Sequence, residues 1–357
     1  MTRKFDARVA IAACLTFLPT FAFGETLPWG ESSDLVAWEV FAQAMAPAGA
    51  PGSAQREFET WASDDDLYVK SPPEWPKIGA ARRPPPCKQT FDREMAKAAD
   101  FPTDACIMED INRNWAAFRY IVSNELYSKE GLAKAFQQGL TVSLPEDSVQ
   151  VKADWVKIGD LMRWLDLEEA DVRKTYYVRT EQDGEATVDY ALLGLHLNAK
   201  RTKNWVWATF EHRANPGRCD EMGCHDAFGA VTADVRAKTP ANQTYGDCPK
   251  TPALLALFDN AGLDPIWRNY CLKGSQLAFT KKGGRPKLLG NSLVDRINGR
   301  IPMSRASCVT CHALASFNKA GEPNGAFADN AIGEVDKARL QDYLRNGFVW
   351  GIMVLKK

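Results

Sequence analysis

The sequence contains little histidine and almost no net charge, and both scarcities narrow what the protein can do. Only four histidines occur, and 44 Lys and Arg residues nearly balance 45 Asp and Glu residues, for a formal net charge of −1. A mixed surface without a basic excess gives no electrostatic reason to expect binding to nucleic acid or to anionic lipid. We therefore expect no nucleic-acid partner.

Several common enzyme motifs are missing as well. The chain has no G-x-S-x-G nucleophile elbow, no P-loop, no Rossmann glycine fingerprint and no H-E-x-x-H zinc motif. It also has no internal repeat. The sequence thus offers no motif that would predict a hydrolase, a nucleotide-binding protein or a zinc protease.

Long apolar runs are absent after the first residues. Arg3, Lys4 and Arg8 precede an apolar run from 9 to 23, which closes on the small residue Gly24. This run is shorter than the roughly 20 residues of a spanning helix and has the pattern of a secretory signal peptide. We expect cleavage after Gly24 and a periplasmic protein without stable membrane insertion. A retained N-terminal anchor is the alternative.

Nine cysteines occur, and eight remain once Cys14 leaves with the signal peptide. An even number in an exported protein indicates sulfur engaged in disulfides or in a cofactor. Six cysteines outside one motif described below allow 15 connectivities, among which the neighbours in sequence, Cys87 with Cys106 and Cys248 with Cys271, are the simplest pairs.

Hydrophobic periodicity predicts both helices and strands. Helical spacing is found over 33–46, 109–138 and 251–262, whereas 147–213 is rich in β-branched and aromatic residues and predicts an antiparallel sheet. Asp183-Gly184 predicts a hairpin turn within it. We interpret Trp205, Trp207 and Phe210 as core or sheet-face residues, and 267–279 as a further strand.

The chain beyond residue 290 predicts helices again, one through the motif at 308–312 and one over 334–348. We therefore expect an α+β fold. Its parts are a signal peptide (1–24), a mostly helical N-terminal region (25–146), a β-rich middle domain with disulfide-bearing loops (147–285) and a small, mostly α-helical domain (286–357).

The stretch SCVTCHALASF, residues 307–317, contains the pattern C-x-x-C-H at Cys308, Cys311 and His312. Residues three apart lie on one face of a helix, so both sulfurs can reach the two vinyl groups of a haem while the adjacent imidazole binds the iron. The pattern predicts one covalently attached haem c with His312 as the proximal ligand.

Other interpretations of this pattern have less support. A thioredoxin-like C-x-x-C follows a strand in a βαβ unit, and no such unit precedes residue 308. A structural zinc site needs four ligands, usually from two such pairs, and the sequence has one. A plain disulfide between Cys308 and Cys311 is the remaining alternative.

The motif together with DKARLQDYLRNGF resembles the attachment helix and final helix of bacterial periplasmic c-type cytochrome domains. The resemblance covers about residues 290–357. It implies a cytochrome c-like domain and extends residue by residue to Cys308, Cys311 and His312. Upstream, WVWATFEH and WRNYCLKGSQ resemble a group of exported bacterial proteins that carry one such motif near the C-terminus.

The second axial ligand departs from that family's pattern. Small c-type cytochromes usually place a methionine between the two helices, but residues 313–347 contain neither Met nor His. His212, Met353 and His196 are the leading distal candidates, and Met303 and His225 are further ones. Methionine would raise the redox potential, a second histidine would lower it, and an open position would allow ligand chemistry.

A second cluster, Cys219, Cys224 and His225, has the spacing C-x4-C-H. Some multihaem cytochromes attach haem at that spacing, so a second haem is an alternative. The surrounding Asn-Pro-Gly and Gly223 indicate a tight loop, for which a local disulfide is the simpler interpretation.

The sequence thus predicts one-electron transfer through haem c, with redox partner proteins that it does not identify. The alternative is an enzyme, a haem-dependent peroxidase, oxidase or other oxidoreductase, which would need an open sixth position or a second haem. A haem-based sensor or a structural exported protein is a third hypothesis.

Overall fold

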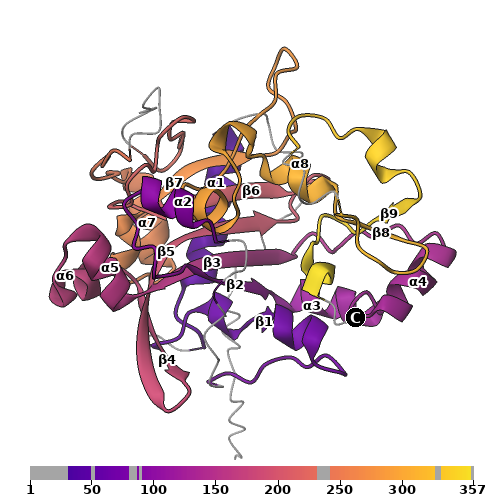
Figure 1. Ribbon diagram of the computed structural model, residues 1–357, viewed down its shortest axis with the longest axis horizontal. Coiled ribbons are helices and arrows are strands. Elements are labelled where there is room, and N and C mark those ends of the chain that lie inside the picture. Colours follow the sequence, from indigo (N-terminus) through magenta and orange to yellow (C-terminus); the bar gives the residue numbers. More distant parts are fainter. Residues whose placement is uncertain are drawn as a thin grey trace, which may run out of the picture.

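The computed structural model describes residues 31–49, 53–79, 87, 91–230, 242–325 and 331–354. The expected signal peptide lies outside these ranges. Within them, no helix combines the length and the apolar character needed to cross a bilayer. An antiparallel sheet runs through the middle of the molecule, with helices around it (Figure 1).

The sheet has seven strands in the order β1-β2-β3-β5-β6-β7, and β4 pairs with the end of β5 that β6 leaves open. All neighbours are antiparallel. The strands are β1 (Ala62–Ser63), β2 (Met108–Arg113), β3 (Val149–Lys157), β4 (Val178–Asp183), β5 (Ala186–Ala199), β6 (Val206–His212) and β7 (Tyr270–Gln276). The sheet expected in 147–213, the strand expected in 267–279 and the hairpin turn at Gly184 are confirmed.

The α-helices are short. They are α1 (Glu31–Met45), α2 (Arg93–Ala98), α3 (Trp115–Ser123), α4 (Lys129–Gln137), α5 (Ile158–Leu165), α6 (Glu169–Thr175), α7 (Pro252–Asn260) and α8 (Cys308–Ala313). Single turns of 3-10 or π type are η1 (Glu57–Thr60), η2 (Asp65–Val69), η3 (Pro265–Asn269), η4 (Val294–Asn298), η5 (Met303–Arg305), η7 (Lys337–Leu340) and η8 (Gly351–Val354). The mixed α+β class is therefore confirmed.

One face of the sheet is apolar and packs against α1 and α7. The rings of Trp38 and Phe41 on α1 lie 4.9 and 4.6 Å from the ring of Phe210 on β6. Phe258 of α7 completes this aromatic group, and all four side chains are buried. Because burying one such side chain contributes about 1.5–3 kcal/mol, this face supplies much of the hydrophobic core.

The opposite face of the sheet is buried as well, and polar side chains occupy its middle. On β5, Leu195 and Leu197 belong to the apolar core, so His196 and Asn198 point to the other side, as the alternation of a strand requires. Residues 289–298 cover this face. The fully buried Asn291, for example, donates to Thr209 Oγ1 at 3.0 Å. The C-terminal part of the chain is thus attached to the polar face by specific hydrogen bonds.

The structure differs from the prediction at two of the expected helices. Residues 109–138 are predicted to be helical, but 109–113 belong to β2, and only the rest contains helices, α3 and α4. Charged side chains explain the strand, because Glu109 on β2 pairs with Lys152 on β3 at 2.6 Å and Arg113 donates to Gln150 at 3.1 Å. Cross-strand pairing of polar groups here outweighs the helical spacing.

The final helix expected over 334–348 is also absent. Its place is taken by η7 and then β9 (Tyr343–Arg345), which pairs with β8 (Ser316–Asn318). Asp342, Gly347 and Phe348 have φ of 65°, 58° and 72°, which no α-helix accommodates. Among the described residues beyond 285, the only α-helix is α8, so the mostly α-helical character expected for 286–357 is not found there.

The hydrophobic cores cross the expected boundaries at 146 and 285. Strands from both sides of residue 146 join in one sheet. Val309 and Phe317 share a core with Trp207 of β6 and with Phe118 of α3. Figure 1 shows α8, β8 and β9 together at one side of the sheet, with α4 beside them. The three regions therefore pack as one unit in the described residues.

Three disulfides are present: Cys87–Cys106, Cys219–Cys224 and Cys248–Cys271. All three are the sequence-local pairs that the cysteine spacing favoured. Disulfides of this kind persist in oxidising compartments, which agrees with an exported protein.

Candidate functional site

The helix α8 carries the C-x-x-C-H motif and is held at its start by the sheet. Gln276, at the end of β7, accepts a hydrogen bond from Val309 N at 3.1 Å and donates to Ser307 Oγ at 3.0 Å. Thr310 donates to the carbonyl of Gly333 at 2.8 Å. Gln276 and Thr310 are completely buried. The position of the motif is therefore set by residues far away in the sequence.

Cys308 and Cys311 are free thiols, and they are the two cysteines of the described residues that form no disulfide. Burial, followed by the negative charge of Asp295, raises the pKa of both thiols, that of Cys311 to about 12. Because the thiolate is the reactive form, these cysteines do not resemble the activated pair of a disulfide oxidoreductase. The absence of a bond between them also leaves the plain-disulfide alternative without support.

His312 has one ring nitrogen fixed and the other available. Its Nδ1 lies 2.9 Å from the carbonyl oxygen of Phe348, so Nδ1 carries the hydrogen and donates it. Burial lowers the pKa of His312 to about 4, which keeps the ring neutral. The ring packs against Trp207 with centroids 4.5 Å apart. A neutral imidazole whose Nδ1–H is held by a carbonyl presents the lone pair of Nε2, as metal-bound histidines commonly do.

Polar side chains of the sheet lie near the motif. His196 Nε2 is 3.0 Å from Asp295 Oδ2 in η4, and Lys152 is the neighbour of His196 across β3 and β5. Besides burial, electrostatic interactions with Lys152 and His196 contribute to the low pKa of His312, and the interaction with Asp295 opposes them. The motif and this polar group are therefore electrostatically coupled.

His196 resembles His312 in that an oxygen atom lies beside one of its ring nitrogens while the other nitrogen has no partner in the described part of the chain. Its Nε2 faces a carboxylate, and its Nδ1 is buried without a hydrogen-bond partner among the described residues. The pKa of Asp295 would be raised by burial, but His196 and Lys152 hold it below its usual value, so this carboxylate remains charged beside the ring. An imidazole held by a carboxylate at one nitrogen and unpartnered at the other is suited to bind a metal.

The other candidate distal ligands, His212, Met353 and Met303, have less support from their surroundings than His196. His212 uses both ring nitrogens, since Nε2 lies 3.0 Å from Thr175 O and Nδ1 accepts from Ala214 N at 3.2 Å. It is also five residues along β6 from Trp207, about 16 Å at the usual rise per residue. Met353 in η8 is 44% exposed, and Met303 is buried in η5. His212 is thus a hydrogen-bonded structural residue.

The second candidate haem site is not formed. Cys219 and Cys224 are joined in a disulfide, so neither sulfur is available for a thioether bond. His225 Nε2 lies 3.1 Å from the carbonyl of Met222 within the same loop. The local disulfide is therefore confirmed, and the arrangement of these sulfurs gives a second haem no support.

The structure adds residues that sequence reasoning did not assign to the site, namely Gln276, Trp207, Phe348, Lys152 and Asp295. Groups of three or more His, Cys, Asp or Glu side chains arranged to hold a metal ion are not found in the described part of the chain. Comparison with protein-family models, with curated proteins and with solved structures finds no match.

Proposed function

We propose that the protein is an exported, periplasmic haem c protein that transfers single electrons. Its haem would be attached by thioether bonds to Cys308 and Cys311, with His312 as proximal ligand, as in the cytochrome c-like domain that the motif resembles. A haem held there supplies an iron that alternates between the ferrous and ferric states.

The main support for this proposal comes from the two cysteines and the histidine of α8. The two cysteines left out of disulfides lie three apart on α8, and the next residue is a neutral histidine with Nδ1 bound to a carbonyl and Nε2 available. Thioether formation needs free thiols, and iron ligation needs an unprotonated nitrogen. The residues present therefore fit the chemistry of covalent haem attachment.

The polar face of the sheet supports a second part of the proposal, that His196 is the distal ligand. Its Nδ1 is unpartnered, and Asp295 holds its other nitrogen. Lys152, paired with Glu109, is positioned to offset negative charge beside the motif. Two histidine ligands would place the potential below that of a His/Met cytochrome.

A redox titration followed by optical spectra tests this function in protein matured in the periplasm. A single reversible one-electron transition between two low-spin states would support electron transfer. A high-spin haem that binds cyanide or carbon monoxide would instead support the peroxidase or oxidoreductase alternative. A spectrum without haem, indistinguishable from that of the Cys308→Ala/Cys311→Ala variant, would contradict both.

A further inference from the structure

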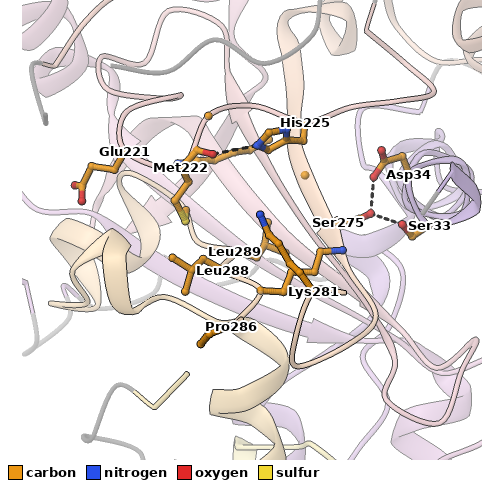
Figure 2. A pocket seen from close by; sticks show the side chains of 14 residues that line it. Ser33, Asp34, Glu221, Met222, His225, Ser275, Lys281, Pro286, Leu288 and Leu289 are labelled. Atoms are coloured by element: carbon orange, nitrogen blue, oxygen red, sulfur yellow. Dashed lines mark hydrogen bonds between the residues drawn. The ribbon is translucent and has the colours of Figure 1, made fainter. Parts of the chain in front are cut away.

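A pocket of about 350 Å³ lies beside the motif and plays no part in the proposed haem attachment. Its wall comes from the start of α1, from β7, from the loop at 221–225 and from the segment 281–289, as Figure 2 shows. Leu289 belongs to this wall, and its carbonyl oxygen is 3.5 Å from Cys308 Sγ. The pocket and the motif thus share one residue as their boundary. Its volume is within the range of pockets that bind small molecules.

The charged groups of the pocket are not equivalent. Asp34 is tied into the wall, since its carboxylate accepts hydrogen bonds from Ala227 N at 2.8 Å and from the Ser275 hydroxyl. Lys273 is paired with the buried Glu211 at 3.3 Å. Glu221 stands at the far edge of the pocket, and Figure 2 shows its carboxylate pointing away from the other labelled side chains.

Lys281 and Lys287 remain as cations that line the pocket, and neither has an acidic side chain within 4.0 Å among the described residues. Both line the same pocket, and their like charges act on each other: burial lowers the pKa of Lys287, Asp34 opposes this, and Lys281 lowers it further. An anion between the two ammonium groups would relieve that repulsion. The remaining lining combines apolar side chains with a few polar ones; the apolar side chains are Met222, Pro286, Leu288 and Leu289, and the polar ones are Ser33, Ser275 and His225.

We propose that this pocket binds a small organic anion, with a carboxylate between Lys281 and Lys287 and an apolar body against Leu288 and Leu289. The combination of a few polar anchors with an apolar wall is typical of small-molecule sites. Charge-assisted hydrogen bonds to two ammonium groups would select a carboxylate over a neutral compound of the same shape.

Isothermal titration calorimetry with 1-naphthoate and with the uncharged 1-naphthamide tests this proposal on the full exported chain. We expect naphthoate to bind and naphthamide to bind at least about tenfold more weakly. Lys287→Met should weaken naphthoate binding by about tenfold or more. Lys281→Met should weaken it as well, and because this side chain is exposed, the variant keeps the fold and the test intact if Lys287→Met unfolds.

The matched control is Lys282→Met, which removes a cation from the same segment without touching the pocket lining. Binding of naphthoate by this variant should equal that of the natural chain. Three results would overturn the proposal: no binding of naphthoate at millimolar concentration, equal binding of the two probes, or an equal loss in Lys282→Met.

One consequence depends on the proposed haem. A carboxylate bound between Lys281 and Lys287 adds a negative charge in the pocket whose wall, at Leu289, adjoins Cys308; this charge would stabilise the ferric state, so naphthoate should lower the midpoint potential of the haem protein. The calorimetric titration does not need a haem. Failure of the anion site and failure of the haem proposal can therefore be told apart.

Discussion

Replacing Gln276 with leucine removes the side chain that joins the sheet to the start of α8. Gln276 is completely buried and makes three hydrogen bonds, from Val309 N at 3.1 Å, to Ser307 Oγ at 3.0 Å and to Lys287 O at 2.8 Å. A neutral hydrogen bond contributes about 1 kcal/mol, and a buried group left without its partner costs about 1–3 kcal/mol. Since leucine has a similar volume and leaves no large cavity, the hydrogen bonds dominate. The expected loss is about 3 kcal/mol.

Urea unfolding followed by tryptophan fluorescence measures this loss, and Gln182→Leu is the matched control. Gln182 is an exposed residue of β4 whose side chain bonds to Gly184 O at 3.1 Å, so its replacement should change the free energy of unfolding by less than about 0.5 kcal/mol. Gln276→Leu should also lower the amount of haem per chain, because α8 would lose its fixed place. A loss below about 1 kcal/mol would refute the view that Gln276 positions the motif.

Three further predictions follow from the site and its neighbours. His196→Leu should convert a low-spin haem to a high-spin one in the optical spectrum, whereas Met353→Leu should leave the spectrum unchanged; the reverse result would reassign the distal ligand. Burial lowers the pKa of His212 from 6.5 to about 3, so the unfolded chain binds a proton that the folded chain excludes, and stability should fall as the pH drops below 6.5. Between pH 6.5 and 5 this amounts to about 2 kcal/mol, and urea unfolding of His212→Gln should lack that part of the slope. Cys219→Ala/Cys224→Ala should cost roughly 2 kcal/mol of stability in the same assay while the haem content by pyridine haemochrome stays the same; a fall by half would restore the second-haem interpretation.

The sequence predicted those helices and strands whose own hydrophobic spacing matches the way they pack on the sheet. Helix α1 has apolar residues at helical spacing and packs them on the sheet. Strands β3, β5 and β6 are rich in β-branched and aromatic residues, and they form the centre of the sheet. The motif itself was visible because its spacing is independent of the rest of the chain.

Elements determined by distant contacts were missed. The segment 343–345 forms a strand because it pairs with 316–318, and this pairing cannot be read from its own helical spacing. The same holds for Met108–Arg113, where cross-strand ion pairs decide the structure. Helices α5 and α6 were not anticipated inside the β-rich region.

The surroundings of the motif could be predicted only in part. Lys152, His196 and Asp295 are brought together by strand register and by the fold of η4, neither of which the sequence displays. One signal was available, since Leu195 and Leu197 alternate with His196 and Asn198, which indicates a strand with one apolar and one polar face. That alternation identifies the side on which His196 lies, but not its partner.

Intact-mass and peptide mass spectrometry of the naturally exported protein measures whether haem is attached to α8. We expect one added haem mass per chain, located on the peptide that contains Cys308 and Cys311 and lost in the Cys308→Ala/Cys311→Ala variant. A chain without any added mass, or with haem on another peptide, would contradict it.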